Sequence, residues 1–405
     1  TGGRLLEGKP RKGVLAAGIL LALAPLIGFK YLGFLTKSVL SVLAHLGVQI
    51  APPAFDFLLP MGISFYTLQT VGYLVDTYRG EKAEHNLLDF ALFVGFFPQM
   101  VSGPISRGNR LLPQLSAAKR PAFDDLRDGV LLLIWGYFLK IVVADRAALF
   151  VAAVYAPESE YEGWFYIVAT LLFCLQLYGD FGGCSVMAMG TAKILGIDLI
   201  DNFNAPYFSQ SIAEFWQRWH ISLSTWFRDY LYIPLGGNRK GTLRKYLNVL
   251  VTFAVSGLWH GADWNFLLWG LYYGVLLLIE KLWLGKYLER LPKALRWLLC
   301  MILVCIGWVM FNLTDFVQMR CALARMFSFT HVALPQSLAA DVSIVPPLLW
   351  MLPALVFSTP VCRRVHLGES CGAEIVRNVV CLALLAVCIV FSVSATFNPF
   401  IYFRF

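Results

Sequence analysis

The sequence predicts an all-α protein that crosses a membrane several times. Of its 405 residues, 58% are hydrophobic and only 14% are charged, and the mean hydropathy is +0.66. One soluble core could not bury that much apolar surface, so the excess must face lipid. The apolar residues also gather into runs that approach or exceed the roughly 20 residues a helix needs to cross a bilayer.

These apolar runs are the predicted membrane spans. The longer ones cover Val14–Leu35, Gly129–Tyr155, Trp164–Met189, Trp264–Leu284 and Asn378–Ala395. The shorter ones, which are thin spans or helices that stop inside the membrane, cover Leu87–Val101, Tyr246–Trp259, Trp297–Phe311 and Ile344–Val361. Together they predict roughly eight to ten spans.

The charged residues set the orientation of these spans. The net charge is +8, but the basic residues lie in short loops between spans, which argues against a nucleic-acid partner. The positive-inside rule assigns to the cytoplasm the loops Arg4–Lys12, Arg107–Arg127, Arg239–Lys245, Lys286–Arg296 and Arg363–Arg377. The polar loop Asn312–Ser343 is then expected outside. Because the first apolar run follows a basic loop and is too long for a signal-peptide core, we expect further residues upstream of Thr1.

The nine cysteines lie mostly within apolar segments and form no C-x-x-C pair, so neither a metal site nor a disulfide framework is predicted. The P-loop, zinc-protease, nucleophile-elbow and dinucleotide-binding motifs are also absent from the sequence. Candidates for chemistry are therefore the ionisable residues in apolar context, which are costly there.

His260 is the first candidate. The chain makes one excursion from the predicted cytoplasmic side, out along Tyr246–Trp259 and back along Trp264–Leu284, and His260 lies at the turn. The outward limb spans about 21 Å at 1.5 Å per residue, less than the hydrocarbon thickness of about 30 Å, so His260 is expected within the membrane. If helix continues through the turn, Ser256 and Trp264 flank the imidazole. A neutral imidazole can accept a proton from a hydroxyl, although a histidine here can also simply join helices by hydrogen bonds.

His220 is the second candidate, at the edge of a predicted amphipathic helix over Ser211–Leu235. Its apolar face has residues at helical spacing, namely Ile212, Phe215, Trp216, Trp219, Leu223, Trp226, Phe227 and Tyr230. The opposite face is too charged for a lipid-embedded span and fits the interface or a wet cavity. Gln217 and Ser224 share a stripe with His220. The histidine is either a second reactive group or an interfacial residue satisfied by these neighbours.

Other charged residues lie in apolar runs. Asp180 stands in a Gly-rich break that could line a channel, whereas pairing explains Lys140, Asp145 and Arg146 more simply. The remaining histidines are expected to be structural or solvated: His45, His85, His331 and His366.

Three segments resemble the membrane-bound O-acyltransferase (MBOAT) family, and within it the bacterial branch of alginate O-acetyltransferases. They are Asp201–Tyr207 (DNFNAPY), Ser211–Arg239 and Gly257–Trp264 (GLWHGADW). Supporting matches are Ser64–Gln69, Asp76–Gly80, Phe97–Ile105 and Phe400–Phe405. The resemblance runs from about Pro60 to the C-terminus. It implies one membrane domain over residues 1–405, with a signature core at about 201–285 and without the family's usual N-terminal spans.

The resemblance implies that His260 is the catalytic histidine and His220 the second histidine of the site. Around them we expect substrate contacts from Gln217, Arg218, Trp219, Ser224, Asp180, Trp259, Asn238 and Arg239. No metal is expected. One departure is Val186, which stands where the family pattern has an acidic residue, so this chain lacks a charge at that position.

The expected function is acyl transfer, with acetyl as the expected group, across a bacterial cytoplasmic membrane whose lipid surrounds the chain. The donor is an acyl-CoA or acyl-carrier thioester from the cytoplasm, with no tightly bound cofactor. The acceptor is an extracytoplasmic polysaccharide or cell-wall glycan, reached directly or through a partner acetyltransferase. The stretch Pro234–Arg239 favours this branch over D-alanyl transfer to teichoic acid. A polymer or lipid-intermediate carrier and a structural scaffold are the alternatives, but a carrier needs charge pairs or broken helices at a midplane site.

Overall fold

The computed structural model describes residues 2–8, 11–51, 53, 55, 59–117, 120–157, 159, 161–329 and 371–393. These residues form helices and loops, and no strand occurs among them, which confirms the all-α class. Several expected features lie wholly or partly outside the described residues: the span Ile344–Val361, the loops Asn312–Ser343 and Arg363–Arg377, His331, His366 and the C-terminal motif Phe400–Phe405.

Five helical stretches in the described part of the chain are long and apolar enough to cross a membrane. They are Lys12–His45, Trp164–Ile194, Trp264–Leu288, Lys293–Asn312 and Gly372–Val393, and each overlaps a predicted span. Three further predicted runs lie among the described residues but not among these five. Leu87–Val101 forms only the short helix Leu87–Val94, and the helix across Gly129–Tyr155 carries three charged residues in its middle. Tyr246–Trp259 belongs to the helix Thr242–His260, whose first turns carry two basic residues.

The first part of the chain contains a long apolar helix followed by shorter ones. In order, the elements are α1 (Gly2–Leu6), α2 (Lys12–Leu26), the π-helix η1 (Ile27–Tyr31), α3 (Leu32–His45), α4 (Ile63–Tyr78), α5 (Leu87–Val94) and α6 (Gly108–Ser116). A pair of long helices follows, built from α7 (Phe123–Tyr137), η2 (Phe138–Ala144), α8 (Asp145–Val154), α9 (Trp164–Leu177), η3 (Tyr178–Gly182) and α10 (Gly183–Ile194).

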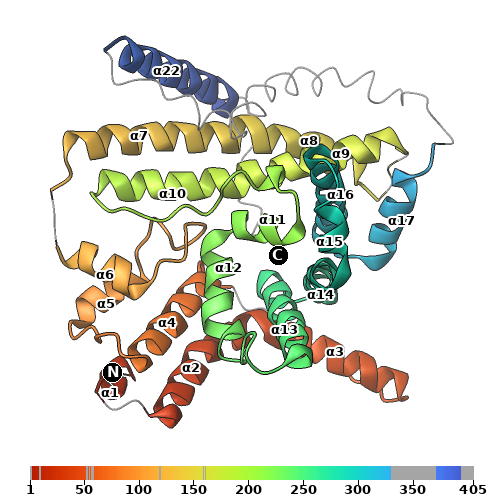
Figure 1. Cartoon of the computed structure of the whole chain (residues 1–405), viewed down its shortest axis with the longest axis horizontal. Helices are drawn as coiled ribbons and strands as arrows, with labels where there is room; N and C mark the ends of the chain where they lie inside the picture. Colours follow the sequence, from red (N-terminus) through yellow and green to blue (C-terminus); the bar gives the residue numbers. More distant parts are fainter. Residues whose placement is uncertain are drawn as a thin grey trace.

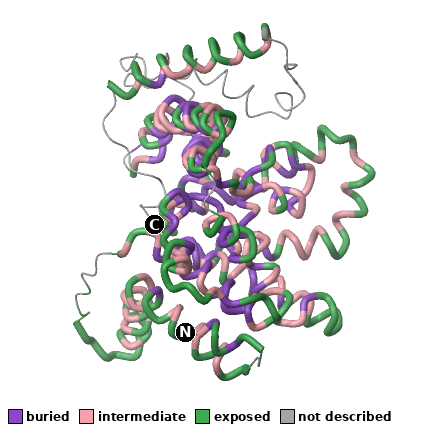
Figure 2. Tube along the Cα trace, turned by 90° about the vertical axis from the view of Figure 1, so that its left-hand side faces the viewer, coloured by how far each residue is buried: buried purple, intermediate pink, exposed green. Residues whose placement is uncertain are grey.

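The remaining described elements surround the middle of the molecule. They are η4 (Pro206–Phe208), α11 (Ile212–Arg218), α12 (Ile221–Phe227), η5 (Arg228–Tyr232), α13 (Thr242–His260), α14 (Trp264–Ile279), η6 (Glu280–Leu284), α15 (Gly285–Leu288), α16 (Lys293–Asn312), α17 (Phe316–Met326) and α22 (Cys371–Val393). Buried residues gather near the middle of the trace, whereas α22 is largely exposed (Figure 2).

The helices α7 and α10 lie side by side with their backbones in close approach (Figure 1). A Cβ added to Gly136 would meet the carbonyl oxygen of Gly183, and a Cβ on Gly183 would meet that of Gly136. Gly129 and Gly190 repeat this arrangement two turns away. Small residues at such positions allow helices to pack tightly in a membrane, where lipid provides no hydrophobic drive for association.

The predicted Gly-rich break around Asp180 is not a break. The chain continues from α9 through the π-helix η3 into α10 as one helical stretch. The Lys140 Nζ lies 2.9 Å from a carboxylate oxygen of Asp180 and 2.9 Å from one of Asp145. The pairing expected for Lys140 and Asp145 is therefore confirmed, and it includes Asp180.

Candidate active site

His260 ends α13 and lies buried among aromatic rings. Its relative exposure is 4%, and its ring centroid lies 5.0 Å from that of Trp259, 5.1 Å from Trp269 and 5.6 Å from Phe311. The helix does not continue through the turn, because Gly261 is extended and α14 begins only at Trp264. The rings around the imidazole are therefore those of Trp259, Trp269 and Phe311, and not the Trp264 ring that the helical spacing suggested.

Trp264, which the helical spacing placed beside His260, is instead 50% exposed. Its ring packs on Phe34 of α3, with centroids 5.4 Å apart. Helical spacing cannot be carried across the extended backbone at Gly261, so this expectation failed for a local conformational reason.

Two glycines let α13 and α14 approach closely behind His260. A Cβ on Gly257 would meet the backbone carbonyl of Phe266, and a Cβ on Gly270 would meet that of Phe253. The indole of Trp269, one residue before Gly270, is thereby held against the imidazole at the end of α13. The two helices thus form a rigid wall on one side of the histidine.

His220 lies between α11 and α12, at a break in what the sequence predicted as one helix. Its backbone is left-handed, with φ 44° and ψ 56°, a conformation that few residues other than glycine adopt. The ring is 1% exposed and lies 4.6 Å from the Phe181 ring and 6.1 Å from the Trp259 ring, centroid to centroid. The break turns His220 inward instead of leaving it at a helix edge.

The segment around Asn202 supports this break. The amide of Ile221 donates to the Asn202 carbonyl at 2.9 Å, and the Asn204 amide donates to the Arg218 carbonyl at 2.9 Å. The Asn202 side-chain oxygen accepts from the Ser222 hydroxyl at 2.6 Å and from the Ser222 amide at 3.3 Å. Backbone groups freed on both sides of His220 are thus satisfied by the neighbouring chain.

The two histidines share the Trp259 ring, which contacts both imidazoles. Neither ring nitrogen of His220 has a hydrogen-bond partner among the described residues. Buried polar atoms almost always have a hydrogen-bond partner, so two such nitrogens in one buried ring are unusual. A buried pair of imidazoles within an aromatic shell is an arrangement suited to binding and moving a proton at a substrate group.

The other predicted site residues fall into two sets. Trp219 and Trp259 are buried beside the histidines, and Asp180 precedes Phe181, whose ring packs on His220. The Ser224 hydroxyl donates to the Trp219 carbonyl at 3.3 Å.

The second set lies nearer the surface. Gln217 and Arg239 are exposed. Arg218 forms an ion pair with Glu214 at 2.6 Å, and exposed Asn238 accepts from the Tyr232 hydroxyl at 2.7 Å. Roles of these residues in substrate binding stay predictions.

A polar cavity of about 710 Å³ adjoins this site through α12. Ile221, the residue after His220, and Thr225 line one side. Three arginines line it as well: Arg107, Arg110 and Arg228. The lining also includes three aspartates, Asp198, Asp201 and Asp229, so the cavity carries charges of both signs.

Asp229 organises the arginines at the rim of this cavity. It pairs with Arg107 and also with Arg228, the latter at 2.8 Å. Burial alone would raise the pKa of the Asp229 carboxyl, but hydrogen bonds from Arg228 and Arg107 outweigh burial and hold that pKa below its ordinary value. The carboxylate is thus charged at neutral pH and fixes the two guanidinium groups in place.

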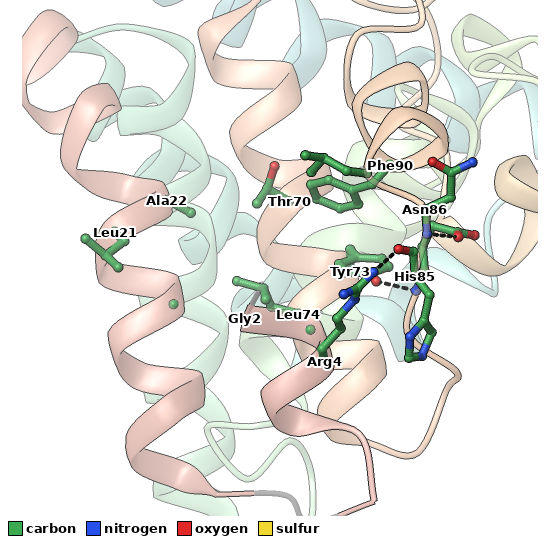
Figure 3. A pocket seen from close by; sticks show the side chains of 14 residues that line it. Gly2, Arg4, Leu21, Ala22, Thr70, Tyr73, Leu74, His85, Asn86 and Phe90 are labelled. Carbon is green, nitrogen blue, oxygen red and sulfur yellow. Dashed lines mark hydrogen bonds between the residues drawn. The ribbon is translucent and has the colours of Figure 1, made fainter.

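A separate cavity of about 470 Å³ lies between α1, α2, α4 and α5 (Figure 3). Its walls include Leu21, Leu74 and Phe90. Arg4 donates to the backbone carbonyl of His85 at its polar end (Figure 3). None of the residues that line this cavity belongs to the site around His220 and His260.

Sequence reasoning missed several residues that shape the site. Trp269 and Phe311 were assigned to spans, and periodicity does not tell which ring of a span meets a distant histidine. Asn202 and Ser222 lie within segments that carried the family resemblance, so their positions were noticed but their support of the His220 backbone was not.

The fold and the site define a class: a membrane protein of several apolar helices with two buried histidines that share an aromatic shell. The chain belongs to the membrane-bound O-acyltransferase family, MBOAT, whose family model matches residues 74–317. It is therefore an acyltransferase, and the resemblance noted in the sequence is confirmed.

Its relatives include acyltransferases of three names. The chain is 37% identical over 363 residues to the probable alginate O-acetylase AlgI of Azotobacter vinelandii, covering 89% of this chain and 72% of that protein. It is 30% identical to the peptidoglycan O-acetyltransferase of Helicobacter pylori, over 86% of this chain and 75% of the relative. It is also 30% identical to the teichoic acid D-alanyltransferase of Bacillus subtilis, over 70% and 78% respectively.

Proposed function

We propose that this chain transfers an acyl group, specifically acetyl, across a bacterial cytoplasmic membrane to an extracytoplasmic polysaccharide or cell-wall glycan. The donor is a cytoplasmic acyl-CoA or acyl-carrier thioester, and the glycan receives the group directly or through a partner acetyltransferase. The observation that carries the proposal is the buried pair His220 and His260 around Trp259. The names of the alginate and peptidoglycan relatives support a glycan acceptor.

In this mechanism His260 is the general base. Its imidazole takes the proton of an acceptor hydroxyl as the hydroxyl oxygen attacks the thioester carbonyl. The carbon–sulfur bond then breaks, the thiolate leaves and takes up the proton, and an O-ester remains on the acceptor. The aromatic shell around His260 excludes water, which would otherwise hydrolyse the thioester.

His220 is the partner group in this proposal. A ring N–H of His220 donates to the carbonyl oxygen as negative charge develops there, which is the usual way a preorganised donor lowers a barrier. The left-handed backbone and the Asn202 segment hold the ring before substrate arrives. Loss of this donor is expected to slow the reaction less than loss of the base.

The donor enters from the predicted cytoplasmic side. We propose that its phosphate groups contact the side chains of Arg239 or Lys240, which are exposed on the loop Gly236–Gly241. The backbone amides of Gly236, Gly237 and Arg239 already donate to carbonyls within this turn and are not offered to the phosphate. The cavity beside α12, which Arg110 and Arg228 line together with Asp198 and Asp201, is a second candidate surface near His220. Either surface would hold an anionic donor while its thioester extends toward the histidines.

The test replaces His260 with glutamine, which keeps volume and hydrogen-bonding capacity but cannot accept a proton at neutral pH. Loss of a positioned base typically costs about 10²–10⁴ in rate. In a strain whose only copy is H260Q, acyl content of the surface polymer should fall to background with normal protein in the membrane. The control is H45Q, which changes an exposed histidine outside the site.

Other results of the same experiment point to other functions. Normal acylation with H260Q would remove the proposed role of His260. Loss of polymer export itself would favour a carrier. D-alanyl ester in place of acetyl on the polymer would favour the teichoic acid branch, to which one relative belongs.

A further inference from the structure

Lys30 of the first long helix reaches the end of α13, where His260 lies. Its Nζ donates to the backbone carbonyl of Trp259 at 2.7 Å and to that of His260 at 3.1 Å. The neighbouring Tyr31 hydroxyl donates to the carbonyl of Leu258 at 2.8 Å. Three consecutive carbonyls of the last helical turn are thus bound by two adjacent side chains from another helix.

These contacts supply hydrogen-bond donors to the C-terminal end of α13. The last four carbonyls of an α-helix have no partner within the helix, and the C-terminal end carries partial negative charge. Gly261, which follows α13, is extended and does not form the left-handed turn that commonly caps such an end. An ammonium group among these carbonyls makes charge-assisted hydrogen bonds, which are the stronger kind.

The backbone around Lys30 is also unusual. Residues Ile27–Tyr31 form the π-helix η1 within the stretch Lys12–His45. Pro25 precedes it and lacks the N–H that would close the normal helical turn. Wider turns of this kind redirect side chains and occur frequently at functional sites. Here the redirected pair, Lys30 and Tyr31, meets the turn that carries His260.

We propose that Lys30 is a positioning residue for acyl transfer. Its ammonium group holds the backbone of Trp259 and His260, and so sets where the imidazole stands between the Trp259 and Trp269 rings. Tyr31 assists through Leu258. This inference rests on the proposed role of His260, because Lys30 acts through that residue and does not touch substrate in this scheme. A lysine inside an apolar helix is costly, which is consistent with a functional reason for its presence.

The test compares three variants of two adjacent residues with a matched control and with H260Q. K30M keeps length and apolar packing but removes every donor, K30R restores a cation, and Y31F removes only the bond to Leu258. K37Q is the matched control, because Lys37 lies on the same long helix and is exposed. H260Q completes the set.

The first measurement is acyl content of the surface polymer per variant protein in the membrane. Displacing a reacting group by about 1 Å can cost about a hundredfold, so K30M should lose roughly ten- to a hundredfold, Y31F less, and K37Q nothing. K30R should recover part of the loss. A merely structural lysine would lower the amount of protein and leave the activity per protein unchanged.

The second measurement does not need activity. Diethyl pyrocarbonate modifies exposed imidazoles, and mass spectrometry of the purified protein reports the extent at His260. Modification of His260 should be faster in K30M and Y31F than in the wild type and in K37Q. If K30M does not accumulate, Y31F and K30R carry the test.

Two outcomes separate the two proposals. Wild-type acylation and wild-type His260 modification in a stably inserted K30M would overturn the positioning role, even if H260Q is inactive. Full activity of H260Q would instead overturn the proposed function. In that case the modification rate of His260 alone decides whether Lys30 holds the end of α13.

Discussion

Single residues at this site take conformations that their type does not suggest. His220 occupies a left-handed backbone region, and an adjoining segment rather than a glycine makes this possible. The sequence identified both histidines from their apolar surroundings and from the family resemblance. It could not predict the break at His220, because no proline or glycine marks it and the bonds that support it come from Asn202, distant in sequence.

The support from Asn202 predicts a measurable cost. N202A leaves the hydroxyl and amide of buried Ser222 without their acceptor, and an unsatisfied buried group costs about 1–3 kcal/mol. We expect a lower unfolding temperature of the detergent-solubilised protein and reduced acyl transfer. S116A is the control, because Ser116 is exposed and lies outside the site. Equal stability of N202A and wild type would contradict the argument.

At the scale of elements, tight helix contacts position the site. The amphipathic pattern over Ser211–Leu235 correctly predicted helical structure and an inward apolar face. It predicted one helix, whereas the structure has α11, α12 and η5 in this segment. Periodicity reports which face is apolar. It does not report where a chain bends to follow a partner.

The contact of α13 with α14 gives a second prediction. G270A would push the added methyl group into the carbonyl of Phe253, and overpacking of this kind costs about 1–3 kcal/mol. Because Trp269 packs on His260, activity should fall as well as stability. G33A is the control, since a Cβ at Gly33 in α3 meets nothing nearby. A G270A protein as stable and active as G33A would show that the helices can move apart freely.

The basic loop after η5 gives a third prediction, which concerns binding of the donor. If Arg239 and Lys240 contact phosphate, R239Q/K240Q should raise the KM for acetyl-CoA in membrane vesicles by about tenfold, because a hydrogen bond to a charged group contributes about 1.5–3 kcal/mol. R290Q, another exposed arginine on a predicted cytoplasmic loop, should have no effect. A rise in KM with R110Q alone would move the phosphate site to the cavity beside α12.

At the scale of the whole molecule, composition predicted the all-α membrane class. Five of the predicted apolar runs overlap helices that are long and apolar enough to cross a membrane. The helix α7–η2–α8, which hydropathy treats like any other apolar run, is not among these five and carries three charged residues in its middle. Lys140 pairs with Asp145 within this helix, whereas its pair with Asp180 forms only where η2 meets η3.

Orientation is the fourth prediction. In a cysteine-free variant, a single cysteine replaces Lys240, Arg290 or Thr314, all of which are exposed. Intact cells are then treated with a membrane-impermeant maleimide. The positive-inside rule predicts reaction at position 314 only. Permeabilised cells, in which all three should react, are the control. Reaction at both 240 and 314 in intact cells would reverse the assignment of sides in this region.

The contact between Lys30 and α13 also imposes an order on synthesis. Lys30 is separated from its two acceptors by 229 and 230 residues. At about 5–20 residues per second, a ribosome makes those acceptors about 10–50 s after Lys30. During that interval the Lys30 ammonium group needs another partner, such as water, a lipid phosphate or an insertase. The Lys30 side chain therefore reaches its final partners only after the chain has been made as far as His260.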